Sequence, residues 1–206
     1  MNKAGNIYGV ALNDREQVEA LASSFSDKPY GAPPQAPVVY MKPSVCADGG
    51  PVRLAQGTTL VASPTLALLF ARDTARVSEA DGWGHVGAVC LALDLALPQK
   101  DYYRPAVAQL NGPGFLPLGE FVAPFTPDEI RTYIDKQLVH SWRLDRLVRP
   151  IGKLIADLSA FMTLRASDLL LVGLPGDAPM LRAGQEVHVA AKGLPDLRRE
   201  IQEMQP

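Results

Sequence analysis

The amino-acid sequence predicts one β-rich α+β domain that begins with a small strand-helix region. Of its 206 residues, 47% are hydrophobic and 20% are charged, which is below the roughly 25% charged share of an average globular domain. Glycine and proline contribute 17 and 18 residues, and so many turn-forming residues favour short strands over long helices. Most apolar residues fall in short runs bounded by Gly, Pro and polar clusters, a pattern that is typical of strands.

The first element is a small unit over residues 1–37, read as strand, helix and linker. A short apolar run ends at Asn13, and Asn13 with Glu16 has the spacing of a helix capping box. Apolar residues then recur at helical intervals over residues 18–25, which predicts an amphipathic helix of about three turns. Four prolines within residues 29–37 predict a stiff, extended connector.

Residues 38–192 are expected to form the core of the domain. Its expected strands are 38–41, 60–61, 66–70, 86–97, 131–139, 169–172 and 186–190. A helix begins at Pro150, with an apolar stripe that runs to Phe161. A second helix is weaker, over residues 78–85, because it contains two glycines. Residues 193–206 form a tail in which apolar residues alternate with charges, and we expect a frayed helix there.

Charge and cysteine content exclude several classes of protein. The formal net charge is −2, from 20 basic and 22 acidic residues, so no basic surface for nucleic acid or an anionic membrane is expected. The longest uncharged stretch contains too many polar residues for a membrane span. No signal peptide is visible, and Cys46 and Cys90 lie too far apart for a zinc motif. We therefore expect a cytoplasmic chain.

Common catalytic motifs are absent, since there is no nucleophile elbow, P-loop or HExxH sequence. Asp94 stands out because it interrupts the apolar run from Val89 to Leu97. A buried carboxylate must find hydrogen-bond donors, a cation or a proton. Asp94 is therefore either a hydrogen-bonded residue at a strand end or the remnant of a metal site. The basic stretch over residues 143–149 is interpreted as a solvated face or a partner contact.

Several segments, taken in order, resemble the fumarylacetoacetate hydrolase superfamily over residues 38–192. The segments are Lys42-Pro43, the strand that ends at Asp94, Tyr102-Tyr103-Arg104-Pro105-Ala106, Gly114-Phe115-Leu116-Pro117-Leu118-Gly119 and Gly173-Leu174-Pro175. The N-terminal segments 8–13 and 28–34 extend the resemblance over nearly the whole chain. The resemblance implies a mixed β-roll with short helices around its core. It also implies Mg²⁺ or Mn²⁺ held by three carboxylates, where the ion stabilises an enolate of a 2-oxo acid.

The N-terminal segments resemble one branch of this superfamily, which acts in the degradation of 4-hydroxyphenylacetate. The resemblance implies a subunit of an isomerase/decarboxylase. Such an enzyme converts 5-carboxymethyl-2-oxo-hex-3-ene-1,7-dioate to 2-hydroxyhepta-2,4-diene-1,7-dioate, and then isomerises that product to 2-oxohept-3-ene-1,7-dioate. In the assembled enzyme the substrate would be a small 2-oxo-dicarboxylate.

The sequence departs from its family at the metal ligands. The resemblance places the two glutamates of a Glu-x-Glu motif at Ser63 and Thr65, and it places the third ligand at Asp94. Two neutral hydroxyls remove two negative charges from a site for a divalent cation. The family's lysine is also missing, with Leu110 nearest to its place. We therefore expect no metal on this chain and weak or no activity in isolation.

Three interpretations follow. In the first, the chain is a subunit of the enzyme, and a homologous second subunit carries the metal. We expect the chain to assemble with that second subunit or as a homodimer. In the second, the chain is a non-enzymatic domain that binds an oxo acid through Ser63, Thr65 and Lys42. The third rebuilds a metal site around Asp94, with Asp48, Asp73 or Glu120 as ligands. The remaining weak candidates for a catalytic role are Lys42 and Arg104.

Overall fold

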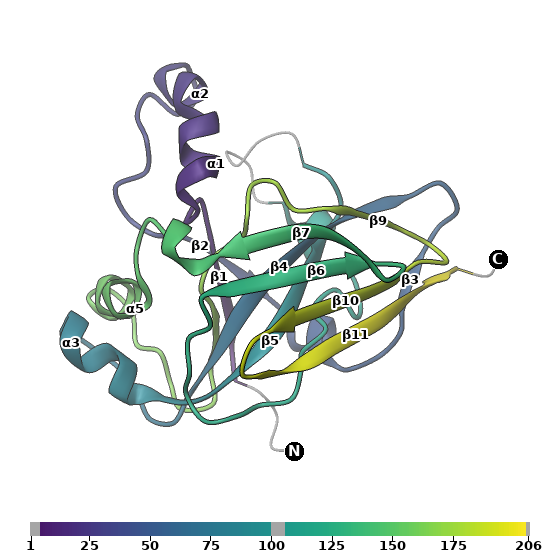
Figure 1. Ribbon diagram of the computed structural model, residues 1–206. Helices are drawn as coiled ribbons and strands as arrows, with labels where there is room; N and C mark the ends of the chain where they lie inside the picture. The colour runs from purple at the N-terminus through teal and green to yellow at the C-terminus, as the bar shows by residue number, and fades with distance from the viewer. Residues whose placement is uncertain (1–4, 100–105, 205–206) are drawn as a thin grey trace.

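The computed structural model describes residues 5–99 and 106–204, and within these it contains two β-sheets and a few short helices (Figure 1). The six-stranded sheet has the order β2-β1-β8-β4-β5, with β9 beside β4. Its strands are β1 (Ile7–Ala11), β2 (Val38–Lys42), β4 (Thr59–Phe70), β5 (Val86–Ala96), β8 (Leu169–Leu171) and β9 (Met180–Arg182). The predicted β-rich α+β class is therefore confirmed.

The second sheet has five strands in the order β3-β11-β10-β6-β7. They are β3 (Val52–Leu54), β6 (Glu129–Ile134), β7 (Gln137–Arg143), β10 (Glu186–Ala191) and β11 (Leu194–Glu203). The helices are α1 (Arg15–Ala20), α2 (Ala22–Ser26), α3 (Glu79–Gly82), α4 (Val107–Leu110) and α5 (Ile151–Ser159). Three 3₁₀ turns, at Ser44–Ala47, Trp83–His85 and Leu144–Arg146, complete the described elements.

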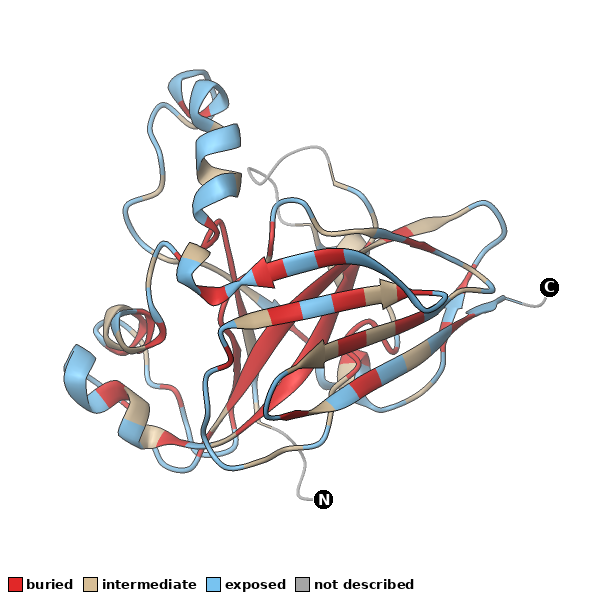
Figure 2. Cartoon of the chain, in the orientation of Figure 1, coloured by how far each residue is buried: buried red, intermediate tan, exposed pale blue. Residues whose placement is uncertain are grey.

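The main core lies between the two sheets. Leucines on one face of β4 and β5, such as Leu66 and Leu91, pack with Val189 and Ile201 of the five-stranded sheet. Figure 2 shows β4 and β5 buried along nearly their whole length, whereas the strands in front of them alternate between buried and exposed residues. This difference is expected, because one sheet is covered and the other has a face in water.

The opposite face of the six-stranded sheet, here called the inner face, carries several small residues between larger ones. The strand pairing places one row across the sheet: Tyr40, Gly9, Leu171, Ala67 and Cys90. Two positions further along β4 and β5 the pair is Thr65 with Ala92, and then Ser63 with Asp94. Because side chains alternate along a strand, these residues share a face. The sequence-predicted metal ligands therefore point to the same side of the sheet.

The N-terminal helix differs from the expectation. It is divided at Leu21 into α1 and α2, and both project from the body of the molecule (Figure 1). The capping box does not form, because Asp14 is the N-cap residue and makes no side-chain cap bond. The Asn13 side chain instead bonds the backbone of Arg149 and Val172. Its amide is fully buried and joins β1 to two distant segments.

The expected frayed helix at the C-terminus is wrong, because residues 194–203 form strand β11 between β10 and β3. Leu194 pairs with Ala191, and Leu197 pairs with Val189. Three steps on β11 therefore oppose two on β10, which is a β-bulge. The bulge places both leucines on the buried face at a spacing that imitates a helix.

Other elements also differ in extent. The single weak strand expected over residues 131–139 is a hairpin of β6 and β7. Asp135 and Lys136 both have positive φ at its turn, as a two-residue hairpin of this kind requires. Helix α5 begins at Ile151, one residue later than expected, because Pro150 is its N-cap residue. Phe161 lies beyond its end and is 64% exposed.

Candidate functional site

Asp94 is the carboxylate around which the candidate site is built. It lies near the end of β5 on the inner face, and it is 1% exposed. One carboxylate oxygen, Oδ1, is 3.0 Å from Nζ of Lys42, and the other, Oδ2, accepts a hydrogen bond of 2.5 Å from the Tyr40 hydroxyl. Burial raises the pKa of Asp94, while the Lys42 ammonium and the Tyr40 hydroxyl oppose that rise. A buried carboxylate was expected to need a cation or hydrogen-bond donors. Lys42 is the cation and the Tyr40 hydroxyl is a donor.

Lys42, at the end of β2, has a fully buried side chain. Its ammonium forms an ion pair with Asp94 and donates to the backbone carbonyl oxygens of Leu95 at 3.1 Å, Leu110 at 2.5 Å and Phe115 at 3.3 Å. A lysine ammonium has three protons to donate, so these oxygens satisfy it fully. Lys42, one of the weak catalytic candidates, therefore has no proton or charge directed toward an open space.

Ser63 and Thr65 lie on β4 with their side chains on the same face as Asp94. Ser63 pairs directly with Asp94 and is 5% exposed. Thr65 is fully buried, and its hydroxyl donates to the Gly173 carbonyl oxygen at 2.7 Å. The hydroxyl of Thr65 therefore ties β4 to the loop that follows β8. The other weak catalytic candidate, Arg104, lies outside the described residues.

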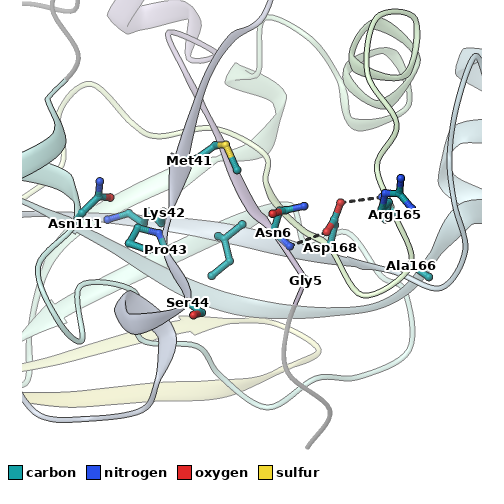
Figure 3. Close-up of a pocket in the computed structure, with 11 residues that line it drawn as sticks. Gly5, Asn6, Met41, Lys42, Pro43, Ser44, Asn111, Arg165, Ala166 and Asp168 are labelled. Atoms are coloured by element: carbon teal, nitrogen blue, oxygen red, sulfur yellow. Dashed lines mark hydrogen bonds between the residues drawn. The ribbon is translucent and has the colours of Figure 1, made fainter.

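An open groove of about 730 Å³ lies at the end of β2 and the start of β1 and β8. Figure 3 shows Lys42 and Asn111 at one end of the groove, and Arg165 and Ala166 at the other. The Asp168 carboxylate within it accepts the backbone N–H groups of Asn6 and Arg165. Because Lys42 turns its ammonium to Asp94, Arg165 is the only cationic group that this groove offers among the residues described as lining it.

A second polar centre, missed by the sequence reasoning, surrounds Arg146. Its guanidinium contacts both oxygens of the fully buried Asp14, at 2.8 and 2.6 Å, and also contacts Asp177 at 3.0 Å. Partial burial lowers the pKa of Arg146, but the two carboxylates outweigh it and hold that pKa above its ordinary value. The expectation of a solvated face is therefore wrong for Arg146, whose side chain is 12% exposed.

The family can now be assigned. The model of the fumarylacetoacetate (FAA) hydrolase C-terminal family matches residues 6–202. This chain belongs to the fumarylacetoacetate hydrolase family. The match includes both sheets and every residue of the site described above. The family resemblance and the expected fold are both confirmed.

Two members of the family with known names are similar in sequence to this chain over nearly its whole length. It is 34% identical, over 96% of its length, to the 4-hydroxyphenylacetate degradation bifunctional isomerase/decarboxylase of Escherichia coli, and equally to that of Salmonella dublin. The chain spans 47% of the length of each of these relatives. The chain therefore matches about half the length of either relative.

Solved structures share the fold at lower sequence identity. The 5-carboxymethyl-2-hydroxymuconate delta-isomerase of Mycobacterium smegmatis has a TM-score of 0.80 and 22% identity, with 98% of this chain and 78% of that chain covered. The fumarylpyruvate hydrolase of Pseudomonas aeruginosa, solved with Mn²⁺ and pyruvate, has a TM-score of 0.78 and 18% identity, with 98% and 91% covered. That structural neighbour therefore holds a divalent metal ion.

The donor set of this chain does not fit such an ion. Asp94 is the only carboxylate at the inner-face positions that the resemblance assigns to the metal. Its Oδ2 accepts the Tyr40 hydroxyl, and its buried Oδ1 lies 3.0 Å from the Lys42 ammonium without a hydrogen bond. A cation placed there would also lie beside the buried ammonium of Lys42, which repels it. No cluster of three or more His, Cys, Asp or Glu side chains suited to a metal occurs in residues 5–99 and 106–204.

The site rebuilt around Asp94, which was the third interpretation, is therefore wrong for the described residues. Asp48 and Asp73 accept the backbone N–H groups of Gly50 and Ala166, and Glu120 is exposed. None of the three carboxylates is among the partners of Asp94.

In the part of the chain that the structure describes, no helix is long and apolar enough to cross a membrane.

Proposed function

We propose that this chain is the metal-free half of an isomerase/decarboxylase that acts on a 2-oxo-dicarboxylate. A homologous half carries the Glu-x-Glu motif, the divalent metal and the chemistry. The observation that carries the proposal is Asp94, the one retained ligand, which is held by Lys42 and Tyr40 while Ser63 and Thr65 flank it. The identity to one half of two bifunctional enzymes supports the same assignment.

The reaction explains why such a half needs a partner. Both steps, decarboxylation and the shift of a double bond, develop negative charge on an enolate oxygen. A divalent cation supplies the stabilisation of that charge when it is bound in the homologous half. This chain offers one neutralised carboxylate in the corresponding place, so its contribution is to pack against the catalytic half and order it. We place the assembled enzyme in the cytoplasm, as for bacterial catabolic enzymes of this kind.

The alternative, a non-enzymatic domain that binds an oxo acid, has less support. It needs Ser63, Thr65 and Lys42 as donors, but Lys42 and Thr65 already donate to protein oxygens, which leaves Ser63 alone. The second polar centre does not replace them, because the cleft of about 440 Å³ beside Arg146 is also lined by the acidic residues Glu16 and Asp177. A dicarboxylate would meet repulsion there.

The test is an assay of three preparations with Mg²⁺ or Mn²⁺ and 5-carboxymethyl-2-oxo-hex-3-ene-1,7-dioate. They are this chain alone, a homologous chain that carries Glu-x-Glu and Asp, and the mixture of the two. We expect no metal-dependent turnover by this chain, and a complex with higher activity in the mixture. Calorimetry with 2-oxo-dicarboxylates examines the alternative in the same preparation of this chain.

Three results would contradict the proposal. Turnover by this chain alone would give it a working site. Full activity of the homologous chain alone, with no complex on a sizing column, would remove any need for this half. Heat of binding from a 2-oxo-dicarboxylate and this chain alone would favour the non-enzymatic alternative.

A further inference from the structure

The Tyr40 ring occupies a space that exists because residue 9 is glycine. Gly9 and Tyr40 are directly paired across β1 and β2. A Cβ atom added to Gly9 would lie 2.1 Å from Cζ of the Tyr40 ring and 2.3 Å from its hydroxyl oxygen. Real Cβ atoms do not approach other heavy atoms so closely. Gly9 does not have positive φ, so its backbone conformation does not require glycine, and the ring of Tyr40 does.

From this position the Tyr40 hydroxyl reaches the opposite end of the sheet. β2 and β5 are the first and last strands in the order β2-β1-β8-β4-β5, with three strands between them. Tyr40 nevertheless donates to Asp94, and Lys42 contacts both Asp94 and the Leu95 carbonyl oxygen of β5. The sheet therefore curls until its two edges meet through side chains. No backbone ladder joins β2 to β5 in the described residues.

We propose that Tyr40, Lys42 and Asp94 form a clasp that fastens β2 to β5, with Gly9 as the seat of the Tyr40 ring. In this clasp Asp94 closes the curled sheet and does not act as a metal ligand. Tyr40 is the positioning residue, since its hydroxyl holds the second carboxylate oxygen. The inference extends the proposed function, because it states what the retained aspartate does in a half that has no metal.

Burial and charge both indicate that the interactions of the clasp contribute to the free energy of unfolding. Asp94 is 1% exposed and the Lys42 side chain is fully buried, so water cannot replace either partner. Hydrogen bonds to a charged group are about twice as strong as neutral ones. An edge strand held by one neighbour alone is also a site of local opening. Loss of the Tyr40 hydroxyl should therefore increase local opening in β2 before it does so in the other strands.

The first experiment compares Tyr40→Phe with Tyr133→Phe in EDTA, without substrate. Tyr133 is a matched control, because it lies on β6 and stacks on His188 away from the inner face. Tyr40→Phe should raise the unfolding equilibrium constant about 10- to 100-fold, and Tyr133→Phe should change it far less. Hydrogen exchange should accelerate at the amides of Val38–Lys42 in Tyr40→Phe, and less in β10.

The second experiment tests whether Gly9 is required because it leaves space for the Tyr40 ring. Gly9→Ala should be strongly destabilising in the wild-type chain, and it should have little effect in a Tyr40→Val background, where the ring is gone. Gly84→Ala is the control, since the nearest atom to an added Cβ there is 3.8 Å away. Equal destabilisation by Gly9→Ala in both backgrounds would overturn the role of Gly9.

The clasp itself would be overturned if Tyr40→Phe matched Tyr133→Phe in stability and in exchange of β2. Neither measurement involves turnover or metal. If the chain proved active alone while Tyr40→Phe loosened β2, the proposed function would fail and the clasp would stand.

Discussion

Lys42→Met should lower the free energy of unfolding by about 3–5 kcal/mol, which is the usual cost of removing one partner from a buried ion pair. The substitution keeps an unbranched apolar stem, which ends one atom short of the lysine Nζ, and removes the ammonium. Asp94 would then be buried without a counter-charge, and three backbone carbonyl oxygens would lose their donor. Denaturant unfolding monitored by circular dichroism gives the value directly.

Two controls separate the buried pair from a general effect of losing a lysine. Lys153→Met removes the partner of Asp157 on helix α5, where the lysine side chain is 49% exposed, so the cost should stay within about 1 kcal/mol. In an Asp94→Asn background, Lys42→Met should cost at least about 1 kcal/mol less than in the wild type, because the two residues are in contact. Strict additivity of the two substitutions would show that Lys42 and Asp94 are not coupled.

Arg146→Met should have an effect of similar size, again about 3–5 kcal/mol, because it leaves the fully buried carboxylate of Asp14 without its cation. Asp14 also accepts the Gly176 N–H, so it joins the start of α1 to the loop after β8. We therefore expect hydrogen exchange to increase in α1 and in residues 173–178 together.

The control for this prediction is Arg143→Met. Arg143 pairs with Asp145 through side chains that are 60% and 62% exposed, so its loss should leave stability nearly unchanged. A wild-type unfolding curve for Arg146→Met would contradict the structural role assigned to Arg146, and it would restore the original expectation of a solvated basic face.

Local sequence patterns predicted the class and most core strands because those segments contain apolar residues at strand length. The length of each strand depends on which other strands pair with it, and the sequence does not show that pairing. Strands 60–61 and 66–70 were expected as separate elements, yet β4 runs through both and through Pro64 between them. The proline lies between the segments of β4 that pair with β9 and with β8. Its missing N–H therefore costs no ladder bond.

The site was predictable in part, because chemistry demanded a partner for a carboxylate in an apolar run. The sequence indicated that Asp94 needs a donor or a cation, but Lys42 and Tyr40 lie more than fifty residues away. Only the curl of the six-stranded sheet brings them together. Gly9 carried no signal at all, since a glycine in a strand can have many causes. Its role depends on the partner directly opposite, Tyr40.

The binding of Mn²⁺ to the isolated, EDTA-stripped chain tests the central claim most directly. Electron paramagnetic resonance of free Mn²⁺, titrated against the protein, measures this without any substrate or partner. We expect no site tighter than about 1 mM, in the wild type and in Asp94→Asn alike. One equivalent of Mn²⁺ bound at micromolar concentration, and lost in Asp94→Asn, would contradict the account.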